Sequence, residues 1–172
     1  MLLEENKNFV LWFECVNEKL IGYSDADFAR DVDDRHSTSG YVFVTGNAAV
    51  SWYSGKQKGI STSTAQAEYI ALSHAAKEAI FLRQLFSEFD SSDYGPIMIQ
   101  EDNQAALAIS KNPVFYSKTK HIDICYHFTR EAVAESQIEL QYCNTQYMIA
   151  DILTKPLAKF QFEKLRSRLG SS

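Results

Sequence analysis

Residues 38–54 read TSGYVFVTGNAAVSWYS, two runs of β-branched and aromatic residues separated by Gly46 and Asn47. Such runs are typical of strands, and a Gly-Asn pair between them is typical of a hairpin turn. We therefore expect an antiparallel hairpin with strands over residues 38–45 and 48–54. This hairpin supplies antiparallel strands to the sheet around which the other elements are arranged.

Working outward, residues 19–25 predict a strand that completes a three-stranded antiparallel meander, and residues 9–15 predict an optional extra strand. A long helix is predicted over residues 63–89, because Ser63 and Gln66 resemble a capping box and apolar residues follow at helical spacing. Strands are then expected at 97–100 and 138–143, and helices at 105–110, 122–135 and 145–170, the last interrupted at Pro156.

This order of elements predicts an α/β fold. Its mixed five-stranded sheet would have three antiparallel strands plus two parallel strands, flanked by helices. The length of 172 residues suits one compact domain. We place that domain at residues 20–170 and treat residues 1–19 as an N-terminal connecting segment with the optional extra strand.

Composition narrows the class of protein without fixing the function. The net charge of −5 argues against a simple electrostatic binder of nucleic acid, which would be basic. An enzyme that gathers carboxylates around a divalent metal can still be acidic. Three widely spaced cysteines indicate reduced intracellular thiols, and we expect neither a secretory signal nor a membrane span.

Four carboxylates stand where a mixed sheet can bring them together. Asp25 and Asp102 follow predicted strands, Glu68 lies in the first turns of the long helix, and Asp151 lies near the start of the last helical region. Such a cluster persists mainly when divalent metal neutralises it, and two Mg²⁺ ions roughly 3.5–4 Å apart can hydrolyse a phosphodiester. The spacing alone fits surface carboxylates and helix caps as well.

The residues around these acids resemble the RNase H domain of copia-type LTR retrotransposon polyproteins, from about residue 20 to residue 169. The matching motifs are GYSDAD at 22–27, RHSTSGY at 35–41, AEYIAL at 67–72, DNQAA at 102–106, KHID at 120–123 and ADILTKP at 150–156.

The resemblance implies an RNase H-like fold and an endoribonuclease that cuts the RNA strand of RNA/DNA hybrids during reverse transcription. It implies that Asp25, Glu68, Asp102 and Asp151 are both the catalytic residues and the ligands of two Mg²⁺ ions, for which Mn²⁺ can substitute. Implied partners are the hybrid and the reverse transcriptase portion of the same polyprotein. We expect no membrane association, a monomer in isolation, and an intracellular location in the cytoplasm, within virus-like particles.

Substrate contacts are expected from residues beside the acids. Gln104, with Asn103 before it, resembles the family position that reads the minor groove of the hybrid, although a polar residue at a helix N-terminus fits equally well. Ser63 and Thr64 would donate hydrogen bonds to a phosphate, or simply cap the long helix. The basic stretch from Lys155 to Arg168 is predicted to be a solvated helix face.

Two departures from cellular RNases H affect these expectations. The loop at residues 144–148 has no histidine, and the segment at 112–120 is too short for a basic substrate-gripping protrusion. One alternative is an enzyme of the same superfold with another reaction, such as an integrase or Holliday-junction resolvase, against which the residues at 102–104 and 150–151 argue. The other alternative is a catalytically silent or host-adopted RNase H-like module that only binds nucleic acid. The unsubstituted set of four acids argues against that alternative.

Overall fold

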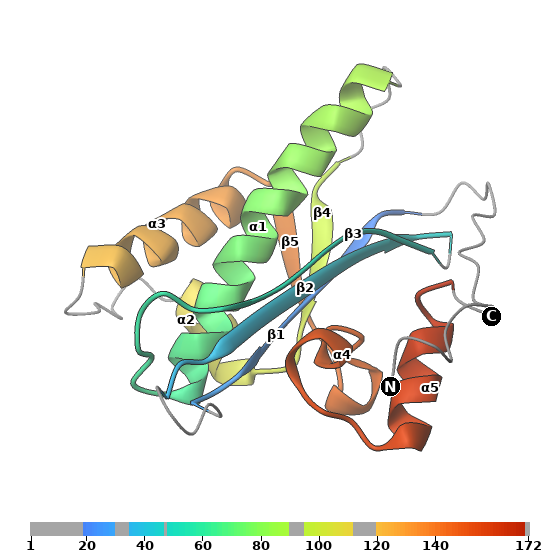
Figure 1. The fold of residues 1–172 in the computed structure, drawn as a ribbon. Coiled ribbons are helices and arrows are strands. Elements are labelled where there is room, and N and C mark those ends of the chain that lie inside the picture. Colours follow the sequence, from blue (N-terminus) through green and yellow to red (C-terminus); the bar gives the residue numbers. More distant parts are fainter. Residues whose placement is uncertain (1–18, 30–34, 47, 90–94, 112–119, 171–172) are drawn as a thin grey trace.

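The computed structural model describes residues 19–29, 35–46, 48–89, 95–111 and 120–170. The strands are β1 (Ile21–Asp27), β2 (Thr38–Thr45), β3 (Ala48–Lys56), β4 (Ile97–Glu101) and β5 (Ile138–Tyr142). The helices are α1 (Thr64–Phe89), α2 (Gln104–Lys111), α3 (Lys120–Ala134), the 3₁₀ helix η1 (Thr145–Tyr147), α4 (Asp151–Thr154) and α5 (Lys159–Ser167), as Figure 1 shows. The predicted strand at 9–15 lies outside the described residues.

The five strands form one mixed sheet in the order β3-β2-β1-β4-β5. β1 pairs antiparallel with β2, and β2 with β3, whereas β1 pairs parallel with β4, and β4 with β5. The predicted fold class is confirmed. The parallel pairs need crossover connections, which α1 provides between β3 and β4 and which α2 and α3 provide between β4 and β5.

The sheet is covered on both faces, and two adjacent residues of β2 mark the two cores. Phe43 packs with Leu72 of α1 and with Ile99 of β4. Its neighbour Val42 packs with Met148 and Ile149, in the segment that leads into α4. Because successive side chains of a strand point to opposite faces, α1 and the C-terminal segment lie on opposite sides of the sheet. Figure 1 shows α4 and α5 together near one end of the sheet.

Most element boundaries agree with the sequence prediction to within two residues, and two differ in ways that matter for the site. β1 continues to Asp27, so Asp25 lies inside the strand instead of ending it. The C-terminal region is divided into η1, α4 and α5, and α4 ends before Pro156. Within the described part of the chain, no helix has both the length and the apolar character to cross a membrane.

Candidate active site

The candidate site forms where β1 and β4 separate. Their parallel pairing ends at Ser24 and Glu101, while β1 continues along β2 with Asp25 opposite Gly40. The chain after β4 turns into α2, so Asp25 lies beyond the end of the β1–β4 pairing. Crevices beyond the carboxyl ends of parallel strands are the usual ligand sites of such sheets.

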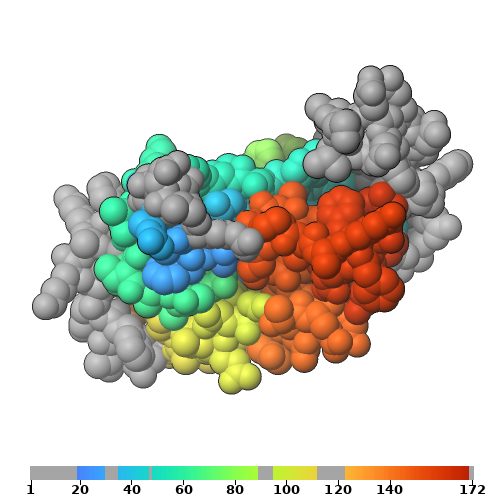
Figure 2. Space-filling model, turned by 60° about the horizontal axis from the view of Figure 1, so that its bottom comes forward, coloured from blue at the N-terminus to red at the C-terminus, as the bar shows by residue number. Residues whose placement is uncertain are grey.

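Three of the four predicted acids meet at this point, beyond the end of the β1–β4 pairing. Asp25 is fully buried, Glu68 of α1 is 4% exposed and Asp102 is partly buried. One carboxylate oxygen from each lies within 4.8 Å of the other two. Figure 2 views this end of the molecule, where the blue, green, yellow and red surfaces adjoin. Segments distant in sequence therefore supply one acidic cluster.

Asp151 is linked to the cluster through the ammonium group of Lys155. It is the first residue of α4, and its Oδ1 lies 2.8 Å from the Lys155 ammonium, which lies 2.8 Å from Asp25 Oδ1 as well. The Thr154 hydroxyl donates a hydrogen bond to the other oxygen of Asp25. The prediction of a solvated Lys155 is wrong, because α4 ends at this residue and turns its side chain toward Asp25.

A fifth carboxylate, Glu101, was not predicted as part of the site. It is fully buried and accepts hydrogen bonds from the Ser24 hydroxyl at 2.7 Å and from the Asn103 backbone N–H at 3.1 Å. The alternation of β4 carries the signal, since Ile97, Ile99 and Glu101 all point to the same covered face. A carboxylate in an inward position of a buried strand requires partners, and here they flank Asp25 and Asp102.

In the absence of a cation, the surroundings of Glu68, Glu101 and Asp151 raise the pKa of these three carboxyls and so favour their protonated forms. Burial, followed by the charges of Glu101 and Asp25, raises the pKa of Glu68 from 4.5 to about 10. Burial likewise raises the pKa of Glu101 well above its ordinary value. For Asp151, burial raises the pKa to about 6 despite the opposing effect of Lys155. Burial is the main cause of all three pKa shifts, and nearby like charges add to it.

The donor set fits a divalent cation. Oxygen ligands from carboxylates are those that Mg²⁺ and Mn²⁺ prefer. Glu68 Oε2 is buried and lacks a hydrogen-bond partner among the described residues, and Glu68 is one of the three converging acids. A buried carboxylate oxygen without a partner is costly, and a cation bound among Asp25, Glu68 and Asp102 removes that cost.

Comparison with known proteins agrees with this geometry. No protein-family model matches the chain. It is 38% identical over 153 residues to a retrovirus-related Pol polyprotein from transposon TNT 1-94 of Nicotiana tabacum, an alignment that covers 88% of this chain and 11% of that polyprotein. The chain is thus a relative of the Pol polyproteins of plant transposons and spans about a tenth of the length of this one.

Solved structures establish the fold. LC11-RNase H1, determined in complex with an RNA/DNA hybrid, superposes with a TM-score of 0.55 at 15% identity, covering 79% of this chain and 94% of that one. The fold is that of RNase H. A foamy viral protease-reverse transcriptase, also in complex with RNA/DNA hybrid, gives a TM-score of 0.57 at 17% identity and covers 80% of this chain and 19% of its own.

On this RNase H fold, the predicted substrate-binding residues lie at two helix starts beside the acids. The Ser63 hydroxyl accepts a hydrogen bond from the Gln66 N–H at 3.2 Å and caps α1, and Thr64 is exposed at the first helical position. Asn103 Oδ1 accepts from the Ala105 and Ala106 N–H groups and caps α2. Gln104 is exposed. Capping is therefore present at Ser63 and Asn103, and substrate contact stays a prediction.

The loop that lacks a histidine places a hydroxyl in the site instead. Asn144 Oδ1 accepts a hydrogen bond from the Gln146 N–H and caps η1. The first residue of η1, Thr145, donates its hydroxyl to Asp102 Oδ2 at 2.7 Å. The loop of this RNase H fold therefore holds one oxygen of Asp102.

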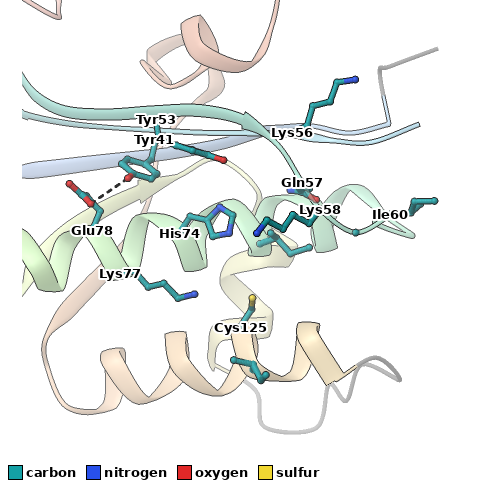
Figure 3. A pocket seen from close by; sticks show the side chains of 13 residues that line it. Tyr41, Tyr53, Lys56, Gln57, Lys58, Ile60, His74, Lys77, Glu78 and Cys125 are labelled. Carbon is teal, nitrogen blue, oxygen red and sulfur yellow. Dashed lines mark hydrogen bonds between the residues drawn. The ribbon is translucent and has the colours of Figure 1, made fainter. Parts of the chain in front are cut away.

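A hollow on the RNase H fold lies apart from the acids, between β3, α1 and α3 (Figure 3). Its volume is about 820 Å³, and Tyr41, Tyr53 and His74 line it. Glu78 is the carboxylate on its wall, and it accepts hydrogen bonds from Tyr41 at 3.4 Å and from Ser51 at 2.6 Å. An engaged single carboxylate does not provide the acidic cluster that metal-assisted hydrolysis needs.

Proposed function

We propose that this chain is an endoribonuclease that hydrolyses the RNA strand of RNA/DNA hybrids, with Mg²⁺ as the cofactor, during retrotransposon reverse transcription. The observation that carries the proposal is the convergence of Asp25, Glu68 and Asp102 within 4.8 Å on an RNase H fold. Similarity to plant Pol polyproteins supports the biological setting.

In this proposal Asp25, Glu68, Asp102 and Asp151 are the catalytic residues and hold two Mg²⁺ ions, or Mn²⁺ in their place. When bound there, the ions would supply a nucleophilic water and charge stabilisation for the departing oxyanion. The carboxylates of the chain form the negatively charged binding site. Thr145 fixes the orientation of Asp102, and Thr154 fixes that of Asp25. Hydrolysis adds the water oxygen to phosphorus and breaks the P–O3′ bond, leaving 5′-phosphate and 3′-hydroxyl ends.

We assign the discrimination between the RNA strand and the DNA strand to polar groups at the starts of α1 and α2. The side chains of Asn103 and Gln104 can each offer an amide N–H, because the cap uses only the carbonyl oxygen of Asn103. Ser63 and Thr64 stand at the N-terminus of α1, where phosphate is favoured. A hybrid presents 2′-hydroxyls on one strand only, and these hydroxyls allow protein groups to tell RNA from DNA.

The proposed working unit is the domain at residues 20–170 within a longer polyprotein, with the reverse transcriptase portion as its partner. The relative from Nicotiana tabacum is about nine times longer than the matched segment, which supports this setting. We propose a monomer for the isolated domain and virus-like particles in the cytoplasm as its location.

The test is cleavage of an end-labelled RNA/DNA hybrid in Mg²⁺, beside matched RNA/RNA and DNA/DNA duplexes. We expect cuts in the RNA strand of the hybrid alone. Asp102→Asn should abolish cleavage with the fold retained in circular dichroism. Glu139→Gln, which removes an exposed carboxylate on β5, is the matched control and should cleave normally.

Two results would redirect the proposal. Tight hybrid binding without cleavage by the wild-type domain, in either Mg²⁺ or Mn²⁺, would favour the silent binding module. Comparable cutting of a branched DNA junction would favour a resolvase-like activity on the same fold.

A further inference from the structure

Lys155 occupies a position that its neighbours determine. Pro156 disfavours helical backbone at the preceding residue, and Lys155 is accordingly extended, with φ −121° and ψ 141°. Its N–H still donates to the Asp151 carbonyl at 2.9 Å, which closes the last turn of α4. The side chain therefore leaves the helix end and reaches back toward Asp151, four residues earlier.

The ammonium of Lys155 binds two acids of the cluster at once. It lies 2.8 Å from Asp25 Oδ1 and 2.8 Å from Asp151 Oδ1. The side chain of Asp25 is fully buried, that of Asp151 is 7% exposed and that of Lys155 is 27% exposed. With Thr154 on the second oxygen of Asp25, both oxygens of that carboxylate are engaged by the end of α4.

This pair differs from an ordinary surface ion pair on the same stretch of chain. Lys159 and Glu163 also stand four residues apart, but their charged atoms are 3.9 Å apart and their side chains are 89% and 48% exposed. Exposed pairs of that kind contribute little to stability. Removing one partner of a buried pair leaves an uncompensated charge and is strongly destabilising.

A divalent ion and the Lys155 ammonium would compete for the same carboxylate oxygen of Asp25. Divalent ions contact carboxylate oxygens at about 2.0–2.6 Å. An ammonium at 2.8 Å from the same oxygen would stand close to such an ion, and the two positive charges would repel each other. Occupation of Asp25 Oδ1 by a metal therefore requires the Lys155 ammonium to move away or to give up part of its interaction.

We propose that Lys155 is a built-in counterion of the acidic site: it holds Asp25 and Asp151 together before metal binds, and it weakens the affinity of the site for divalent metal by competing for Asp25. The inference rests on the proposed function only in that a divalent ion binds this cluster. Lys155 is a positioning residue in this account, since it acts through the two carboxylates.

The test compares Lys155→Met with Lys159→Met, because both remove an ammonium and keep an apolar stem. Unfolding is measured in EDTA, and Mn²⁺ affinity is measured directly by calorimetry or by the electron paramagnetic resonance of free Mn²⁺. Lys155→Met should unfold more readily than wild type in EDTA and bind Mn²⁺ about tenfold more tightly. Lys159→Met should match wild type in both measurements.

Each alternative outcome of these measurements leads to a different conclusion. Wild-type or weaker Mn²⁺ affinity in a folded Lys155→Met would overturn the proposal, because loss of a merely structural contact does not tighten metal binding. If Lys155→Met folds only with Mn²⁺, the ion replaces the ammonium as proposed; if it stays unfolded even with saturating Mn²⁺, the proposal is wrong. A wild type that binds no Mn²⁺ and cleaves no hybrid contradicts the proposed function, and the EDTA comparison still tests the counterion role.

Discussion

At the scale of single residues, the raised pKa of Glu68 makes the stability of the folded domain depend on pH. Its folded pKa of about 10 lies above the ordinary 4.5, so the folded domain retains a proton that the unfolded chain releases. A raised pKa gives stability that is present below the unfolded pKa and lost as pH rises toward the folded one. In EDTA, unfolding of the wild type should therefore become easier as pH rises from about 5 to about 9.

Glu68→Gln should flatten this dependence, because an amide keeps the shape of the protonated carboxyl without titrating. Glu101 continues to titrate in the variant, so some dependence should remain. Urea midpoints in EDTA at several pH values measure the effect, with Glu139→Gln as the control for loss of one carboxylate. Parallel pH curves for wild type and Glu68→Gln would contradict this account.

The sequence predicted the acids more successfully than the groups that hold them. The predicted convergence of strand ends and a helix start in a mixed sheet suggested Asp25, Glu68 and Asp102, and the resemblance to RNase H domains distinguished them from surface carboxylates. Lys155 could not be placed, because its direction depends on where α4 ends, and a short helix before Pro156 is invisible to a periodicity of 3.6 residues. Hydrogen bonds such as that of Thr145 to Asp102 depend on tertiary positions in the same way.

At the scale of elements, the seating of α4 on the sheet depends on Gly40 of β2. A Cβ added there would lie 2.6 Å from Thr154 Cγ2 and 3.0 Å from Leu153 Cβ. Gly40 is also the register partner of Asp25. The absence of a side chain at Gly40 therefore lets α4 approach the strand that carries Asp25.

Gly40→Ala should displace α4 and destabilise the domain by about 1–3 kcal/mol, as overpacked sites do. Cleavage should fall further than stability explains, because Asp151 and Lys155 move with the helix. Urea unfolding and single-turnover cleavage under fully folded conditions separate the two effects. Gly59→Ala is the control, since a Cβ there meets nothing within 4 Å; equal losses in both variants would refute the role of α4 seating.

The start of α2 allows capping to be separated from substrate contact. Asn103→Ser keeps a good capping oxygen but has no amide to donate, whereas Asn103→Ala loses both. We expect Asn103→Ala to lose about 1 kcal/mol of stability and Asn103→Ser to retain most of it. Both should raise the KM for hybrid. A normal KM for Asn103→Ser would restrict Asn103 to capping.

Elements with strong local signals were predicted closely, and those fixed by tertiary contacts were not. The hairpin of β2 and β3 follows from its two runs of β-branched and aromatic residues and the Gly-Asn pair between them, and α1 follows from its apolar spacing. The end of β1 was placed two residues early because pairing with β2 continues it to Asp27. The prediction of two parallel strands beside the meander was confirmed, since helical crossovers leave few other arrangements.

At the scale of the whole molecule, the net charge of −5 predicts weak binding by the isolated domain. Few phosphate contacts release few counterions, so hybrid affinity should be low and should depend only weakly on salt. Titration of labelled hybrid in Ca²⁺, at several salt concentrations, measures both quantities. Nanomolar affinity at physiological salt would contradict the prediction.

Tethering should compensate for that weak binding. Fusion to a hybrid-binding module raises the effective concentration of substrate without new contacts at the site. We expect faster cleavage at low hybrid concentration and a nearly unchanged rate at saturation. A fusion that instead raised the saturated rate would show that the neighbouring module also alters the chemistry.

The hydrogen bonds from Thr154 and Lys155 to Asp25 close loops of 129 and 130 residues, and this separation has a consequence for synthesis. A ribosome makes Asp25, Glu68 and Asp102 before it makes α4. Until Thr154 and Lys155 have emerged, the nascent chain has no partner for either oxygen of Asp25 from that helix. The acidic site is therefore completed only once the last helices of this domain have emerged, and a chain stopped after Ala150 should fold less stably and cut no hybrid in a cell-free synthesis assay.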